Sequence, residues 1–435
     1  MADYIPVIGL EIHVELNTKS KMFCQCNANY FGKQPNTQTC PVCLGLPGAL
    51  PVPNQKAIKY CQLIGLALRC KLNSKSKFDR KHYFYPDLPK GYQISQYDEP
   101  FCTKGSVEIN AKKFGITRVH MEEDTGKLIH EEDETLIDFN RSGVPLVEIV
   151  TEPDFDNSDD VKRFLEELQV IIRYLGVSDA DMEKGSMRLE PNISLRPKSN
   201  KKLPEYKVEV KNINSFKFVQ KAIEYEIKRQ TEILEKGQMP EQETRGFNED
   251  KRITFSQRSK EYAHDYRYFP EPDIPPFEFN AEYLKKIKTQ IPELASEKMQ
   301  RFIKQYKLKT QDAYTLTRTK ERAEFFEEKA KDKKIAEIFS STQIQDLANV
   351  IINRKLTRSS PDSIFFEALG PIKTDLTALD KVIQSVIKNN WKAIEDYRNG
   401  KENVLMFLIG KVMQEMKGKA DATIVKNKLL DKLKN

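Results

Sequence analysis

The chain has 435 residues, 39% hydrophobic and 31% charged, with a formal charge of +7, so it can bury a large core and form two or three domains. No stretch approaches the eighteen or so continuous apolar residues of a membrane span, and the first residues lack a secretion signal. We therefore expect a soluble cytoplasmic protein without membrane contact, or an organellar one if a transit peptide has been removed, and the odd count of seven cysteines argues against a disulfide framework.

The stretch Gly9–Leu16 predicts a strand with two unlike faces. Its alternation places Glu11, His13 and Glu15 on one side and three apolar side chains on the other. Two carboxylates beside an imidazole supply oxygen ligands for Mg²⁺ and a nitrogen that can coordinate a metal or move a proton. An exposed strand face would need polar residues of no particular kind, and for these residues alone that alternative stays open.

Four cysteines have the pair, loop and pair spacing of a tetrahedral zinc site. They are Cys24, Cys26, Cys40 and Cys43. The loop between the pairs is rich in Asn, Gln and Thr and has little apolar content, so a metal would supply the energy that packing cannot. Four thiols without a metal are the alternative. We expect the other cysteines to be buried thiols.

Residues 77–97 are dense in aromatic residues and cations, contain two prolines and show no helical period, which predicts a long shaped loop. Its cations include Arg80, Lys81 and Lys90. They could hold phosphates beside tyrosines that stack on a base, and a hydrophobic lid is the equal alternative.

Antiparallel strands are predicted between residues 107 and 152. Glu122 and Glu123 end one of them beside His120, and Glu148 interrupts a later apolar run. Because a lone charge in such a run is rarely buried without a partner, we expect Glu148 to face a metal or a cation. An outward-facing glutamate on an edge strand is the alternative.

A helix is predicted over Ser158–Leu175, and the residues that follow return to the strand pattern. Polar and apolar residues alternate without interruption over Ser186–Arg196, with Arg188 and Glu190 on the polar face. Pro191 within this strand argues for a sheet edge or a bulge.

Strand patterns end near residue 290 and helical periods follow, with a second break marked by two prolines. We therefore predict domains at 1–290, 291–375 and 376–435. The last sixty residues hold twelve Lys and Arg against seven Asp and Glu, a net charge of +5. This excess predicts either a polyanion partner or a Lys-rich solvated surface.

The first 290 residues thus predict an antiparallel sheet with a charged polar face. That face carries Glu11, His13, Glu123, Glu148, Arg188, Glu190 and Arg196. Because carboxylates on one face repel one another unless cations lie between them, divalent metals are the simplest explanation. Nearby arginines suit phosphate oxygens, so the combination predicts nucleotide-dependent phosphoryl transfer. The chain has neither a P-loop nor a dinucleotide-binding glycine motif.

Four long motifs resemble those of the GatB family, which supplies one of the subunits of tRNA-dependent amidotransferases. They occupy residues 9–16, 83–96, 120–127 and 265–273, and Cys40–Pro51 is similar to the zinc-bearing members. The resemblance implies an α+β protein with a glutamine-synthetase-like antiparallel-sheet cradle domain, which contains the catalytic site and the zinc. An all-helical domain and a small helical tail domain that binds tRNA follow the cradle.

The resemblance also implies a ligase that forms carbon–nitrogen bonds with glutamine as amido donor. ATP would phosphorylate the side-chain carboxylate of Glu-tRNA(Gln) and/or Asp-tRNA(Asn), and ammonia would then displace the phosphate. Because the chain shows no nucleophile elbow, the ammonia would come from a GatA-like glutaminase subunit, with a small GatC-like protein to brace the pair. The alternative is a non-catalytic, zinc-ordered subunit that only binds tRNA.

The family's functional residues are carried over position by position. The implied catalytic and Mg²⁺-binding set is Glu11, His13, Glu123 and Glu148. The implied ATP and phosphate contacts are Arg80, Lys81 and Arg188. The tail residues expected to meet tRNA phosphates are Lys411, Lys417, Lys419, Lys426 and Lys428. The chain departs from the family at His82 and at Leu189–Pro191, where we expect altered substrate contacts with the reaction retained.

Overall fold

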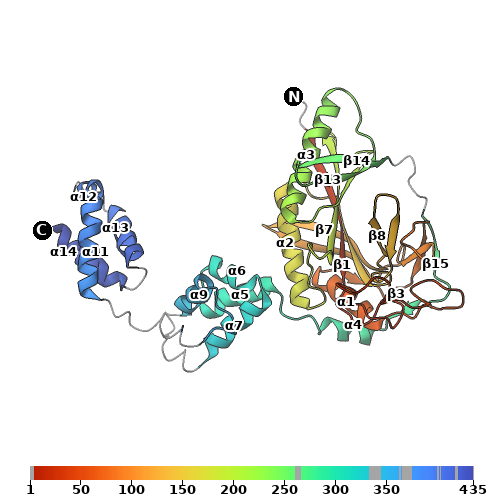
Figure 1. Cartoon of the computed structure of the whole chain (residues 1–435), viewed down its shortest axis with the longest axis horizontal. Coiled ribbons are helices and arrows are strands. Elements are labelled where there is room, and N and C mark those ends of the chain that lie inside the picture. Colours follow the sequence, from red (N-terminus) through yellow and green to blue (C-terminus); the bar gives the residue numbers. More distant parts are fainter. Residues whose placement is uncertain are drawn as a thin grey trace. The chain divides into compact units, whose positions relative to one another are not determined.

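The computed structural model divides into two compact units, Met1–Lys298 and Met299–Asn435 (Figure 1). The residues that it describes are 4–259, 266–332, 344–361, 364, 375–398, 401, 403–416 and 420–434. The expected division at residues 290 and 375 stays a prediction.

A large, mostly antiparallel sheet organises the first unit. Among the described residues, nine strands follow the order β14-β13-β12-β11-β1-β10-β7-β6-β2, and only β12 and β13 pair in parallel. Their bounds are β1 Tyr4–Glu15, β2 Lys71–Leu72, β6 Cys102–Ile109, β7 Lys112–Glu123, β10 Pro145–Thr151, β11 Met187–Pro197, β12 Val208–Lys211, β13 Glu243–Asn248 and β14 Ile253–Ser259. The sequence therefore predicted the type of sheet, while the order of its strands comes from the structure.

The strand order contradicts the alternative that placed Glu148 on an edge strand, and it contradicts the sheet edge expected at Pro191. β10 lies between β1 and β7, so Glu148 is on an interior strand, where its side chain is 9% exposed. β11 lies between β1 and β12, so Pro191 is also on an interior strand. β12 pairs only with Asn192 and Ile193 of β11. Pro191, which lacks an N–H, therefore lies just beyond that short ladder.

Three helices cover the apolar face of the sheet. They are α1 Gln55–Ala67, α2 Ser158–Leu175, which has the predicted bounds, and α3 Phe216–Glu235. Figure 1 shows α2 and α3 on this face. Ile12 and Val14 of β1 pack into this core, while Glu11 and His13 alternate onto the other face. Burial of the apolar side therefore presents the charged residues of β1 on the opposite side.

Smaller elements surround the polar face. They are β3 Lys75–Ser76 with β16 Phe277–Glu278, the three-stranded sheet of β15 Arg267–Pro270, β4 Asp79–His82 and β5 Tyr92–Ser95, and the hairpin of β8 Lys127–His130 and β9 Thr135–Asp138. Residues 77–97, expected to be a loop, thus contribute two strands, because β15 pairs with β4 from nearly 190 residues away.

The C-terminal part of the described chain is helical. Its helices are α4 Ala281–Lys288, α5 Ala295–Tyr306, α6 Thr310–Thr317, α7 Lys320–Lys331, α9 Ile344–Asn353, α11 Leu376–Asn389, α12 Trp391–Arg398, α13 Asn403–Glu415 and α14 Ala422–Lys434. One hydrophobic cluster includes Phe302 and Leu347, and another includes Leu379 and Leu429. None of the described helices combines the length and the apolar character needed to cross a membrane.

Candidate functional site

Three residues from three strands converge on the polar face of the sheet. The pairing of β1 with β10 sets His13 opposite Glu148, and β7 brings Glu122 from the next strand. Nε2 of His13 lies 3.5 Å from a carboxylate oxygen of Glu148 and 3.8 Å from one of Glu122. One ligand atom from each residue lies within 4.8 Å of the other two. An imidazole and two carboxylates at these separations can hold one divalent cation.

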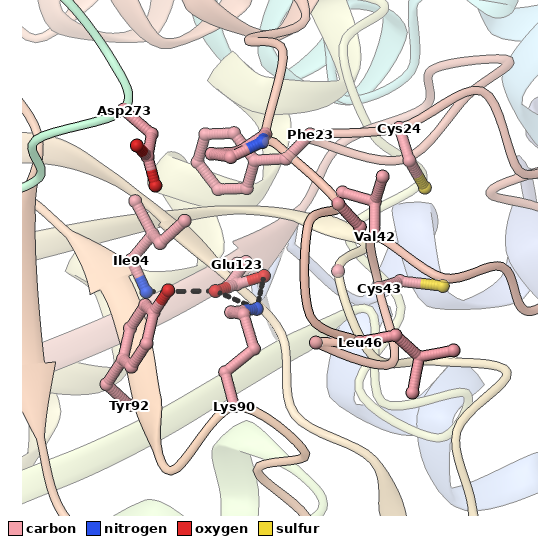
Figure 2. Close-up of a pocket in the computed structure, with 14 residues that line it drawn as sticks. Phe23, Cys24, Val42, Cys43, Leu46, Lys90, Tyr92, Ile94, Glu123 and Asp273 are labelled. Carbon is pink, nitrogen blue, oxygen red and sulfur yellow. Dashed lines mark hydrogen bonds and ion pairs between the residues drawn. The ribbon is translucent and has the colours of Figure 1, made fainter.

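Glu122 takes the place that was expected for Glu123. Glu123 lines a cavity with Cys24 and Cys43. Its carboxylate forms an ion pair with Nζ of Lys90 at 2.7 Å and accepts a hydrogen bond from the backbone N–H of Ile94 at 2.9 Å (Figure 2). The expected set of four ligands therefore does not converge in the structure. The two-residue period of β7 could have identified Glu122 from the sequence. It places Glu122 on the same face of the strand as His120, and His120 pairs with Glu148.

Glu11 belongs to a second acidic group on the neighbouring strands. Glu11 of β1, Glu190 of β11 and Glu209 of β12 bring carboxylate oxygens within 4.8 Å of one another. Burial raises the pKa of Glu11, and the charges of Glu148, Glu190 and Glu209 raise it further. A divalent cation would relieve this repulsion. The sequence singled out Glu190 for its polar face but missed Glu209 as its partner.

The first group is also electrostatically coupled. Burial opposes a charge on His13, but the hydrogen bond and charge of Glu148 raise its pKa to about 9. Burial raises the pKa of Glu148, yet the imidazoles of His120 and His13 bring it well below its usual range. Glu122 accepts hydrogen bonds from Ser95 and Gln93. The carboxylates of Glu122 and Glu148 are therefore held ionised and oriented before any ligand binds.

Two of the three expected phosphate contacts lie beside these groups. Burial opposes the ammonium charge of Lys81, but Glu122 raises its pKa above the ordinary value, as does Glu148. Arg188 donates a hydrogen bond of 2.6 Å to the carboxylate of Asp124. Lys81 thus lies near the carboxylates of the first group, whereas Arg188 is paired with Asp124 and lies 3.9 Å from a carboxylate oxygen of Glu15.

Arg80 is engaged elsewhere. Its guanidinium makes two hydrogen bonds with Glu271, at 2.7 and 2.8 Å, and one of 3.2 Å with Asp273. The side chain also lies over the ring of Tyr92, and the neighbouring His82 stacks on Phe269. Arg80 is therefore held by two carboxylates that belong to neither acidic group.

The four cysteines of the predicted zinc site come together. The sulfur atoms of Cys24, Cys26, Cys40 and Cys43 lie within 4.8 Å of one another. The backbone N–H of Cys40 donates to the Cys43 sulfur at 3.1 Å. Cys24 and Cys43 also line a small cavity of about 140 Å³ next to the Lys90–Glu123 pair (Figure 2). Four converging thiols in a loop of little regular structure fit a tetrahedral Zn²⁺.

The expected tail lysines are distributed over two helices. Lys411 of α13 and Lys426 of α14 are exposed, and Nζ of Lys428 lies 2.7 Å from a carboxylate oxygen of Asp380. Lys417 and Lys419 lie outside the described residues. Two of the five thus present an exposed charge on the described surface, and Lys428 is partly neutralised.

Comparison with known proteins covers nearly the whole chain. Residues 6–285 match the model of the GatB/GatE catalytic domain, and residues 326–433 match that of the GatB domain. The chain is similar to the B subunits of the aspartyl/glutamyl-tRNA(Asn/Gln) amidotransferases of Carboxydothermus hydrogenoformans (45% identity, 100% of this chain and 99% of the relative) and Caldicellulosiruptor saccharolyticus (44%, 99% of each). The corresponding protein of Thermotoga petrophila is 44% identical, again over 99% of each chain.

Proposed function

Because the chain belongs to the GatB/GatE family, we propose that it is the B subunit of an aspartyl/glutamyl-tRNA(Asn/Gln) amidotransferase. A GatA-like glutaminase subunit supplies its ammonia, and a small GatC-like protein braces the two. In this proposal residues 1–290 are a glutamine-synthetase-like catalytic cradle, 291–375 a helical linker domain and 376–435 a tail that binds tRNA. The observation that carries the catalytic part is the pair of acidic groups on one face of the sheet, with Lys81 and Arg188 beside them.

The reaction first makes the side chain of the misacylated amino acid reactive. A carboxylate oxygen of Glu-tRNA(Gln) or Asp-tRNA(Asn) bonds to the γ-phosphorus of ATP, the bond to the β-phosphate oxygen breaks, and ADP leaves. Ammonia then bonds to the carbonyl carbon, phosphate leaves with the electron pair of the C–O bond, and the new amide loses a proton. The first step is needed because oxide is a poor leaving group and phosphate is a good one.

The chain's residues prepare the site for two anions. His13, after losing its proton to become a neutral imidazole, would hold one Mg²⁺ with Glu122 and Glu148. Glu11, Glu190 and Glu209 would hold a second. Magnesium, when bound, offsets the negative charge that gathers between ATP and the attacking carboxylate. Lys81 and Arg188 add fixed positive charge for the phosphate oxygens. In this assignment Glu122 replaces Glu123 as a ligand, and Arg80 has no direct role.

A protein that only binds tRNA would not need this arrangement. Carboxylates that converge on an RNA-facing surface repel phosphates unless a cation is present. The two converging groups therefore favour catalysis over the non-catalytic alternative. The zinc site is assigned a structural role, because its cysteines, two of which line the pocket of Figure 2, are not among the six acidic and imidazole ligands.

The test is an amidation assay on the chain assembled with its glutaminase and small partner subunits. Glu-tRNA(Gln) and Asp-tRNA(Asn) are supplied separately with ATP and either glutamine or ammonium. We expect ATP-dependent Gln-tRNA or Asn-tRNA formation with both nitrogen sources, because ammonium bypasses the glutaminase. Uncharged tRNA is the control for phosphate release. No amidated product from either tRNA, in a complex that hydrolyses glutamine, would overturn the proposal.

A further inference from the structure

A lysine is buried beside Cys43 of the predicted zinc site without a carboxylate partner. Lys21 is 0% exposed, and its Nζ lies 3.7 Å from the sulfur of Cys43 and donates to the backbone oxygen of Phe139 at 3.3 Å. Across the described chain, no carboxylate oxygen comes within 4.0 Å of this nitrogen. Burying an ammonium group without a counter-charge costs several kcal/mol, so the protein must offset this charge by another group.

The thiols are the nearest source of negative charge. Cys43 is the buried member of the four, 3% exposed, and it is the one that Lys21 approaches. Zinc is bound by thiolates, so four cysteines around one Zn²⁺ carry a net charge of about −2. A cation inside the fold would reduce the repulsion among the four ligands. The negative charge of a tetrathiolate zinc site would therefore offset the cost of burying the Lys21 ammonium, and the ammonium would offset the repulsion among the thiolates.

We propose that Lys21 is the internal counter-charge of the zinc site, placed against Cys43 to increase the affinity of the four cysteines for Zn²⁺. This inference rests on the zinc binding proposed above. The next residue, Met22, is connected to Asp124 through two backbone hydrogen bonds. Met22 N–H donates to the oxygen of Gly143, and Gly143 N–H to that of Asp124, which holds Arg188.

The experiment compares four proteins, each assembled with its partner subunits. They are the wild type, Lys21→Met, Lys21→Gln and Lys19→Met. Methionine keeps most of the length of the side chain without its charge, and glutamine keeps an N–H donor without the charge. Lys19 is exposed and controls for the loss of a lysine two residues away. Zinc affinity is measured by competition with a chromophoric chelator, independently of amidation activity.

We expect both Lys21 variants to bind zinc about 10- to 100-fold more weakly than the wild type, the range typical of outer-shell substitutions, and Lys19→Met to be unchanged. If both Lys21 variants bound zinc with wild-type affinity, the inference about Lys21 would be overturned, and the zinc proposal would stand. A wild type that binds no zinc and has four reactive thiols would overturn the zinc proposal, and the inference with it.

Urea unfolding with and without zinc separates a counter-charge from a packing role. With zinc removed, Lys21→Met should be at least as stable as the wild type, because the buried ammonium then lacks its partner. With zinc bound, the variant should be the less stable protein. Destabilisation by the same amount in both states, or variants that fail to fold even without zinc, would show that Lys21 acts through packing and would contradict the proposal.

Discussion

Replacing Glu122 or Glu123 by glutamine should separate metal binding from local stability. The two residues are adjacent on β7, and each substitution removes one charge with little change in size. Glu122 contributes a ligand atom to the group with His13 and Glu148, whereas Glu123 pairs with Lys90. We therefore expect Glu122→Gln to weaken divalent-cation binding and Glu123→Gln to leave it close to normal.

The size of the effect follows from Coulomb's law. Two unit charges about 4 Å apart interact by roughly 4 kcal/mol at an effective dielectric constant of about 20. Water that replaces the lost ligand recovers part of this, so we expect Glu122→Gln to cost about 2–3 kcal/mol, or roughly 30- to 150-fold in affinity. Glu123→Gln should instead lower the free energy of unfolding by about 3 kcal/mol, because the ammonium of Lys90, 12% exposed, loses its partner.

The assay titrates Mn²⁺, followed by its electron paramagnetic resonance signal, into the complex that carries each variant. The Mg²⁺ dependence of amidation with ammonium and the urea midpoint complete the comparison. Equal metal affinity in Glu122→Gln and the wild type, or a larger loss in Glu123→Gln, would refute the assignment of β7 side chains.

Three further predictions address other parts of the molecule. Glu11→Gln should reduce ATP-dependent amidation at least 10-fold with little change in tRNA affinity, because Glu11 belongs to the second acidic group; wild-type turnover would count against that group. Deleting residues 376–435, which hold a net +5 of the formal +7, should weaken tRNA binding about 10-fold and reduce its salt dependence. An unchanged affinity and salt slope would show that the cradle alone holds the tRNA. Burial and the adjacent Asp124 raise the pKa of Glu15 to about 8, so the folded state holds an extra proton, and stability should fall by up to about 5 kcal/mol as pH rises from about 4.5 through 8. Glu15→Gln should flatten this dependence in urea titrations, and an unaltered pH profile would rule the effect out.

The sequence determined those features that depend on neighbours along the chain. The two-residue period of β1 set Glu11 and His13 apart from Ile12 and Val14, because side chains alternate along any strand. The spacing of the four cysteines predicted their convergence, since short pairs joined by a polar loop can close on one centre. The apolar period of α2 likewise predicted its bounds.

The tertiary structure decided which side chains meet across strands. The pairing of β7 with β10 brought Glu122 to His13, and the pairing of β1, β11 and β12 placed Glu11 in a different group. Arg80 pairs with Glu271, which is 191 residues away along the chain. The residues around Arg80 in the sequence therefore could not predict this ion pair. Strand order and register are set by packing of the whole sheet, so a motif can mark which residues carry charge, but the partner that each charge meets depends on contacts between distant segments.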